Sequence, residues 1–314
     1  MHALIVAGPT ASGKSALALD LARHFGGTVI NADSMQVYAE LRVLTARPSL
    51  ADEAAAPHRL YGVRPASVPG SAAWWRGEAL AEIAAALAAG RVPILCGGTG
   101  LYFTALREGL ADIPDPGPAR QAVRARLAEL GPAALHAELA ARDPATAAGL
   151  RPSDSQRLAR ALEVLDSTGR GLAEWQAQGA APADLAVRAV LLDPPREVLR
   201  AAIAARFAAM LDQGALAEVA ALAAQGLDPA LPAMRAHGVP ELCAHLRGEI
   251  PLAEASSRAV LATGQYTRRQ ATWFRRRPPA DPAHTHIIHA RYSGLAQLPN
   301  LRMADLGNFL RGAG

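Results

Sequence analysis

The 314-residue sequence predicts an α/β fold in which a parallel sheet core carries an inserted all-helical domain. Short apolar segments alternate with longer segments of helical periodicity, which is typical of strands joined by crossover helices. Residues 115–185, by contrast, contain only helical patterns. We therefore expect a core formed by residues 1–114 and 186–314, with a helical C-terminal part, and an inserted helical domain over residues 115–185.

The expected elements of the core follow from apolar runs and glycine stops. Short apolar runs predict strands at 3–7, 28–32, from 92 onwards, 186–193 and, as an edge strand, 285–290. Helical spacing predicts helices at 15–26 and 71–90, and the segment 92–109 reads as strand, glycine turn and helix.

The inserted domain has its own set of expected elements. Its helices are expected at 119–130, 133–142, 153–169 and 171–179. Proline-rich stretches at 113–118 and 179–184 are the expected hinges of the insertion.

Composition limits the class of protein. About half of the residues are apolar, 51%, but no uninterrupted apolar run of about 18 residues occurs, so we expect no membrane span. The N-terminus is too short for a signal peptide, and Cys96 and Cys243 are too few for a disulfide framework. These features indicate a reducing, cytoplasmic setting. A formal net charge of +4 permits a polyanionic partner without requiring one.

The stretch GPTASGKS, residues 8–15, matches the phosphate-binding loop G-x-x-x-x-G-K-[ST]. It lies between an expected strand and an expected helix, and Lys14 is the one lysine among 32 basic residues. Because a chance match or a tight turn without ligand explains neither fact, we predict a P-loop NTPase-like core that binds a di- or triphosphate. The binding residues are Gly8, Pro9, Thr10, Ala11, Ser12, Gly13, Lys14 and Ser15, with Ser15 as the expected Mg²⁺ ligand.

The usual partner of this loop in phosphoryl transfer is a metal-binding aspartate after a second strand. Asp193 ends an apolar run, but two prolines follow it, and the run at 92–96 ends in cysteine and glycines. The usual hydrolase residues are therefore absent or disguised.

Several further motifs occur in one order along the chain. They are DSMQVY (33–38), TARP (45–48), APHRLYGV (56–63), CGGTGLYFTAL (96–106), SQRLARALEV (155–164), ARF (205–207) and RRQATWFR (268–275). With these motifs and the phosphate loop, nearly the whole chain resembles the bacterial tRNA dimethylallyltransferases. These enzymes move a five-carbon prenyl group from dimethylallyl diphosphate to N6 of the adenosine beside the anticodon. The fold of that family, a P-loop core with an inserted helical domain, agrees with the elements above.

The resemblance implies catalytic roles for Asp33, Thr99 and Arg206. A carboxylate that accepts a hydrogen bond from the adenine amine can orient it and take its proton, and the resemblance gives this role to Asp33. From the residues alone, Asp33 could equally be a helix N-cap or a second-shell Mg²⁺ ligand. Thr99 could cap a helix, and Arg206 could be an ordinary solvated arginine. The resemblance makes Arg206 a diphosphate ligand and Mg²⁺ the cofactor.

The resemblance also implies contacts with the tRNA anticodon stem-loop. In residues 265–278, five arginines are interspersed with Tyr266, Trp273 and Phe274, a composition that suits unstacked RNA bases, although most arginine runs are solvated helix faces. The family pattern is broken at 235–240, where Val239 and Pro240 supply neither a phenol nor a cation. The expected RNA-binding residues are Asp33, Ser34, Met35, Gln36, Thr99, Arg120, Gln156, Arg157, Leu158, Ala159, Arg160, Arg235, Arg268, Arg269, Gln270, Trp273 and Arg275.

Two other functions share part of this pattern. A P-loop small-molecule kinase would have the loop and an aspartate after the second strand, but it has no use for a basic aromatic C-terminal segment. A non-catalytic, nucleotide-dependent RNA-binding protein would not need Asp33 and Thr99 facing the loop. We expect a monomer that uses tRNA and dimethylallyl diphosphate and has no membrane partner.

Overall fold

The computed structural model describes residues 1–179 and 181–294. The chain forms two compact units: Met1–Arg107 together with the described residues from Asp184 onwards, and the helical unit Glu108–Ala183. The helical unit begins seven residues before the predicted insertion.

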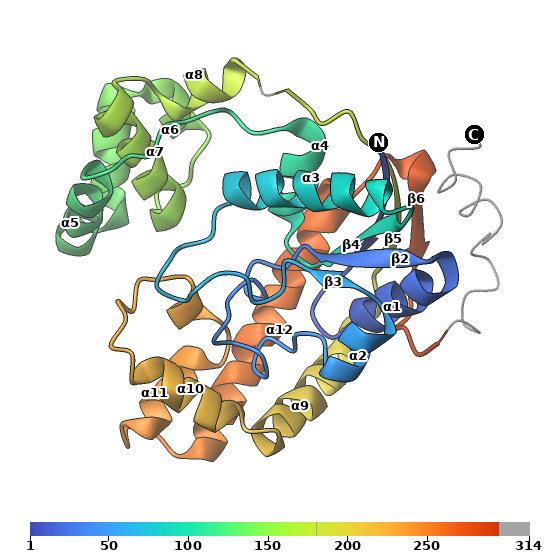
Figure 1. The fold of residues 1–314 in the computed structure, drawn as a ribbon. Helices are drawn as coiled ribbons and strands as arrows, with labels where there is room; N and C mark the ends of the chain where they lie inside the picture. The colour runs from blue at the N-terminus through green and yellow to red at the C-terminus, as the bar shows by residue number, and fades with distance from the viewer. Residues whose placement is uncertain (180, 295–314) are drawn as a thin grey trace. The chain divides into compact units, whose positions relative to one another are not determined.

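The first unit is built on a six-stranded sheet in which all pairs are parallel (Figure 1). Its spatial order is β3-β2-β4-β1-β5-β6. The strands are β1 (His2–Ala7), β2 (Gly27–Asn31), β3 (His58–Arg59), β4 (Val92–Gly97), β5 (Ala186–Leu192) and β6 (Thr285–Ile288). The apolar run of β1 is fully buried because helices cover both faces of a parallel sheet. The predicted fold class is confirmed.

The helices of the first unit divide into those that cover the sheet and those of the C-terminal part. The first group is α1 (Lys14–Phe25), α2 (Leu50–Ala55), α3 (Ala72–Ala88) and α4 (Gly100–Glu108). The second group is α9 (Arg196–Asp212), α10 (Ala215–Ala223), α11 (Val239–Leu246) and α12 (Leu252–Arg276), with single 3₁₀ turns at Ala233–Arg235 and Pro282–His284.

Three apolar clusters pack these helices against the sheet and against the loop after β2. Trp75 of α3 stacks on Tyr102 of α4 with ring centroids 4.3 Å apart, on one side of the sheet. Leu17 and Leu21 of α1 pack with Val6 in a second cluster. A third cluster joins the loop after β2 to α9–α12, so this loop is fixed by the C-terminal helices.

The helical unit contains α5 (Ala119–Arg142), α6 (Pro144–Ala148), α7 (Ser155–Thr168) and α8 (Leu172–Ala177). The two helices expected at 119–130 and 133–142 are the halves of α5. They meet at Gly131, whose φ of 76° is not helical and which precedes Pro132. The break therefore has its cause in the sequence.

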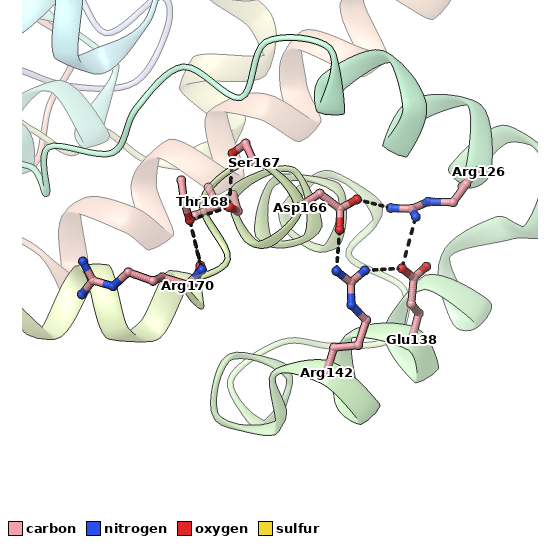
Figure 2. Close-up of polar contacts among 8 residues, drawn as sticks. Arg126, Glu138, Arg142, Asp166, Ser167, Thr168 and Arg170 are labelled. Atoms are coloured by element: carbon pink, nitrogen blue, oxygen red, sulfur yellow. Dashed lines mark hydrogen bonds and ion pairs between the residues drawn. The ribbon is translucent and has the colours of Figure 1, made fainter.

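Four charged side chains tie the two halves of α5 to α7 (Figure 2). Asp166 of α7 accepts hydrogen bonds from Arg126 and, at 2.7 Å, from Arg142. Glu138 pairs with the same two arginines at 3.3 and 2.7 Å. Since each half of α5 contributes to the network, the network holds the kinked helix in one shape.

Three short elements were not predicted: α6, β3 and α2. Strand β3 has only two residues, and α2 is a single capped turn in which Ser49 and Asp52 form a capping box. In the described part of the chain, no helix is both long and apolar enough to span a bilayer.

Candidate active site

The phosphate loop, residues 8–15, joins β1 to α1 at the carboxyl edge of the sheet. Ala11 and Gly13 have φ values of 67° and 92°, and the Ser12 amide donates to the Pro9 carbonyl at 3.2 Å. A Cβ on Gly8 would lie 2.8 Å from Ser12 Oγ and 3.0 Å from the Leu192 carbonyl oxygen. The turn is thus tightly closed, as an anion-binding loop requires.

Lys14 begins α1 and is 8% exposed. Burial lowers the pKa of its ammonium, and the Asp33 carboxylate opposes that shift. No carboxylate pairs with it within 4 Å among the residues that the structure describes. A buried, unpaired cation at a helix N-terminus attracts an anionic ligand. Ser15 follows Lys14 and is exposed at the same helix end.

Asp33 lies in the loop after β2, where two hydrogen bonds fix its position. Its backbone amide donates to Asn31 Oδ1 at 2.8 Å, and its own Oδ1 accepts from the Met35 amide at 3.0 Å. The next helix begins at Leu50, so Asp33 is not a helix N-cap. Its charge acts on both Lys14 and Arg206, whose pKa values it raises against the effect of burial.

Thr99 connects the loop after β4 to the loop after β2. Its Oγ1 accepts from the Ser34 amide at 3.0 Å and donates to Ser34 Oγ at 3.3 Å, while its own amide donates to the Ala32 carbonyl at 3.2 Å. A Cβ on Gly97 would lie 1.9 Å from the Ala32 carbonyl oxygen, so only glycine fits between the two loops. Thr99 therefore positions the residues beside Asp33.

Gln270 of α12 connects the phosphate loop to the turn before α4. Its Oε1 accepts from the Thr10 amide at 2.9 Å, and its Nε2 donates to the Gly98 carbonyl at 2.9 Å. One turn along the helix, Trp273 packs so closely on Gly100 that a Cβ there would lie 2.1 Å from the indole. Both residues were predicted to contact RNA, and the structure gives them packing roles as well.

A cavity opens beside these residues, within the first unit. Its polar side chains include Thr10, Asp33 and Arg206, and its apolar wall is formed by Met35, Leu44, Ile203, Phe207 and Met210. Burial lowers the pKa of the Arg206 guanidinium, which also hydrogen-bonds the Thr45 carbonyl at 3.5 Å. The cavity thus combines a carboxylate, a cation and an apolar surface.

Tyr266 and His237 also line this cavity; Tyr266 was noted only as an aromatic residue of the segment 265–278, and His237 was not predicted. Burial, and then the Asp33 carboxylate, raise the pKa of Tyr266 to about 12, so its phenol is neutral. The His237 ring lies 4.9 Å from that of Tyr266, and burial lowers the pKa of the imidazole. His237 belongs to the segment that departs from the family pattern, which is why no motif indicated it.

The C-terminal end of the described chain runs along the back of the phosphate loop. Arg291 Nε donates to the Ala11 carbonyl at 3.1 Å, and the Tyr292 amide donates to the Ser12 carbonyl at 2.9 Å. The Tyr292 hydroxyl also donates to Asp20 Oδ2 at 2.6 Å. Nothing in the sequence pattern indicated this support.

The predicted RNA-binding residues of the first unit fall into two groups. Ser34 and Met35 are half-buried, whereas Gln36 is buried and donates to the carbonyls of Thr45 and Ala46. Four arginines are exposed: Arg235, Arg268, Arg269 and Arg275. Of these, Arg275 lies 3.5 Å from Asp193.

In the helical unit the structure corrects part of the predicted RNA surface. Leu158 and Ala159 are buried in the core of the unit, because they occupy the inner face of α7, so their side chains are not available to RNA. Gln156 and Arg157 are exposed, and Arg160 is half-buried and lies 3.7 Å from Glu163. Arg120 pairs with Asp115 at 3.1 Å.

Fold and site together define a P-loop-like α/β protein in which the Asp33 carboxylate and Thr10 of the loop at residues 8–15 line one cavity. Two family models match the chain: IPP transferase over residues 36–277 and isopentenyl transferase over residues 1–65. The chain belongs to this family of IPP transferases, which confirms the resemblance found in the sequence.

Individual relatives support the same family assignment. The chain is 62% identical over 314 residues to a tRNA dimethylallyltransferase of Granulibacter bethesdensis, covering 99% of this chain and 98% of the relative. It is 63% identical over 309 residues to that of Acidiphilium cryptum, covering 98% and 94%.

Solved structures support the same fold. A tRNA isopentenylpyrophosphate transferase of Bacillus halodurans matches with a TM-score of 0.65 and 29% identity, covering 99% of this chain and 96% of that one. A eukaryotic dimethylallyltransferase acting on tRNA matches with a TM-score of 0.82 over 100% of this chain and 80% of that one, and at 24% identity it shows the fold alone.

Proposed function

We propose that this protein transfers a dimethylallyl group from dimethylallyl diphosphate to the exocyclic N6 of the adenosine 3′ to the anticodon in tRNA, releasing diphosphate. The relatives named tRNA dimethylallyltransferase support this function and give no support to the small-molecule kinase considered from the sequence. The reaction occurs at carbon, so it needs no phosphoryl transfer.

The phosphate loop and its neighbours would bind the diphosphate of the prenyl donor. Breaking the allylic C–O bond places negative charge on the leaving diphosphate. Backbone amides of the loop, the Lys14 ammonium and the Arg206 guanidinium would stabilise that charge. The apolar wall of the cavity suits the five-carbon group and keeps water from the developing carbocation.

Asp33 would act on the adenine amine. The N6 lone pair is delocalised into the ring, so the amine is a weak nucleophile. A carboxylate that accepts one N6–H bond orients the amine and takes the proton as the new C–N bond forms. Thr99 would be a positioning residue, since it holds the Ser34 amide next to this carboxylate.

The residues at the start of α1 also suit Mg²⁺. This ion binds diphosphate oxygens with one or two protein oxygens and several waters, and Ser15, an exposed residue beside Lys14, would supply its hydroxyl oxygen. When bound, the ion would add positive charge to the leaving group. We infer that the protein works as a monomer in the cytoplasm, and that tRNA is held by its anticodon stem-loop.

The observation that carries the proposal is the common cavity of Asp33 and Arg206, next to the phosphate loop. The test incubates the protein with unmodified tRNA, Mg²⁺ and either dimethylallyl diphosphate or ATP. Prenylated adenosine is expected with the first donor. ADP formation without prenylation would favour the kinase, and tRNA binding without either product would favour a non-catalytic RNA-binding protein.

A further inference from the structure

A groove between α9 and α12 lies next to the reaction cavity. Residues 196, 200 and 203 of α9 line one side, and residues 257, 260, 261, 264, 265, 267 and 268 of α12 line the other. The spacing of three and four residues places each set on one helix face. Ile203 lines both this α9–α12 groove and the reaction cavity, so the two are neighbours.

The groove is positively charged. It is lined by Arg196, Arg200 and Arg268, all of them exposed, and by no acidic residue. Within residues 1–179 and 181–294, no ion pair is recorded for these three arginines. Arg258, on the same helix α12 but outside the groove, instead pairs with Glu254.

The groove also presents apolar surface between its cations. Leu261 is 63% exposed, and Val260 lies beside it. The α12 wall is a mid-helix face, whereas the α9 wall begins at Arg196, the first residue of its helix. The three arginines are spread over two helices with apolar side chains between them, so the groove suits an extended chain of separated phosphates joined by sugars, which needs long cationic side chains and apolar contact.

We propose that the α9–α12 groove binds a stretch of the tRNA sugar–phosphate backbone through Arg196, Arg200 and Arg268. This inference rests on the proposed function for the identity of the RNA. It extends the predicted RNA surface from α12 onto α9, where the sequence analysis placed no RNA contact.

The test is the double variant Arg196→Ala with Arg200→Ala, studied by tRNA binding over a range of salt concentrations. Each lost phosphate contact lowers the slope of log affinity against log salt by about 0.7–0.9, so the double variant should lose about 1.4–1.8 of the slope. The control is Arg23→Ala with Arg91→Ala, which removes the same charge from exposed positions outside the groove. Binding of inorganic diphosphate, measured in parallel, should match that of the wild type.

The outcomes separate this inference from the proposed function. A salt slope equal to that of the wild type, or an equal loss in the control, would overturn the groove as an RNA site. Loss of diphosphate binding with unchanged tRNA binding would assign the groove to the prenyl donor instead. Failure of the wild-type protein to prenylate tRNA that it binds would overturn the proposed function while leaving the groove measurement intact.

Discussion

The Oε1 atom of Gln270 lies 2.9 Å from the backbone nitrogen of Thr10. Through this contact, the helix that carries Arg268 and Arg269 is joined directly to the loop proposed to bind the diphosphate. The Nε2 atom of the same side chain donates a hydrogen bond to the carbonyl of Gly98, the residue before Thr99. A change in the position of α12 should therefore move both the phosphate loop and the turn that carries Thr99.

Gln270→Leu should lower stability and diphosphate affinity together. The substitution leaves a part-buried amide and a buried carbonyl without partners, at a cost of about 1–3 kcal/mol each. Urea unfolding and diphosphate titration measure the two effects. Gln225→Leu, at an exposed position, is the control. Unchanged diphosphate affinity in a folded Gln270→Leu protein would show that the link does not shape the loop.

Asp33→Asn should reduce prenyl transfer by about 10²- to 10⁴-fold, the usual contribution of a general base. An asparagine Oδ1 can still accept from the Met35 amide, so the loop should keep its shape. Diphosphate should bind at least as tightly, because a negative charge near Lys14 and Arg206 is removed. Single-turnover rates and calorimetric titration give the two values, with Asp212→Asn as the control. A near-normal rate would rule out Asp33 as the base.

Thr99→Val and Thr99→Ser form a matched pair. Valine cannot accept from the Ser34 amide and should lower the rate of transfer, with a loss of about 1 kcal/mol in stability, whereas serine keeps the acceptor. A positioning role predicts a lower kcat with little change in KM for the prenyl donor. Equal rates in both variants would show that the hydroxyl is not needed.

His237 should make stability depend on pH. Because burial lowers its pKa in the folded protein, the unfolded chain binds the proton more readily just below pH 6.5. Its contribution to stability is therefore full above pH 6.5 and is lost as the pH falls towards the folded-state pKa. Unfolding at pH 5.5 and 7.5 should show a smaller difference in His237→Gln than in the wild type. An unchanged difference would mean that other groups cause it.

Tyr292→Phe should lower the free energy of unfolding, because it weakens the attachment of the C-terminal segment to the phosphate loop and α1. The lost hydrogen bond, 2.6 Å to the Asp20 carboxylate, is worth about 1.5–3 kcal/mol as a bond to a charged group. A double-mutant cycle with Asp20→Asn isolates the interaction energy. A coupling energy near zero would show that the backbone bond of Tyr292 alone holds the segment.

The fold was largely predictable because its signals are local. The apolar run of β1, the loop around Lys14 and the glycine after α1 each specify structure over a few residues. The break in α5 was predictable for the same reason, from Gly131 and Pro132. Strand β3 was not, since two residues carry no periodicity, and neither was α2, a single turn fixed by its capping box.

The site was predictable only where a motif covers it. Asp33 and Thr99 belong to recognisable segments, and the structure brings their loops into contact. The support from Arg291 and Tyr292 depends on a pairing across about 280 positions, which no spacing rule reveals. Leu158 and Ala159 show the opposite error: a matched motif includes the inward face of its helix, and those side chains serve the core.

The order of the strands also sets the spacing between the phosphate loop and the loop that carries Asp33. The phosphate loop follows β1 and the Asp33 loop follows β2, and β4 lies between these two strands. Neighbouring strands are about 4.8 Å apart, so the ends of β1 and β2 lie roughly 10 Å apart along the rim of the sheet. Under the proposed function, substitutions in the cavity wall would change the space for the hydrocarbon, whereas the spacing of the two loops is set by the backbone of the sheet.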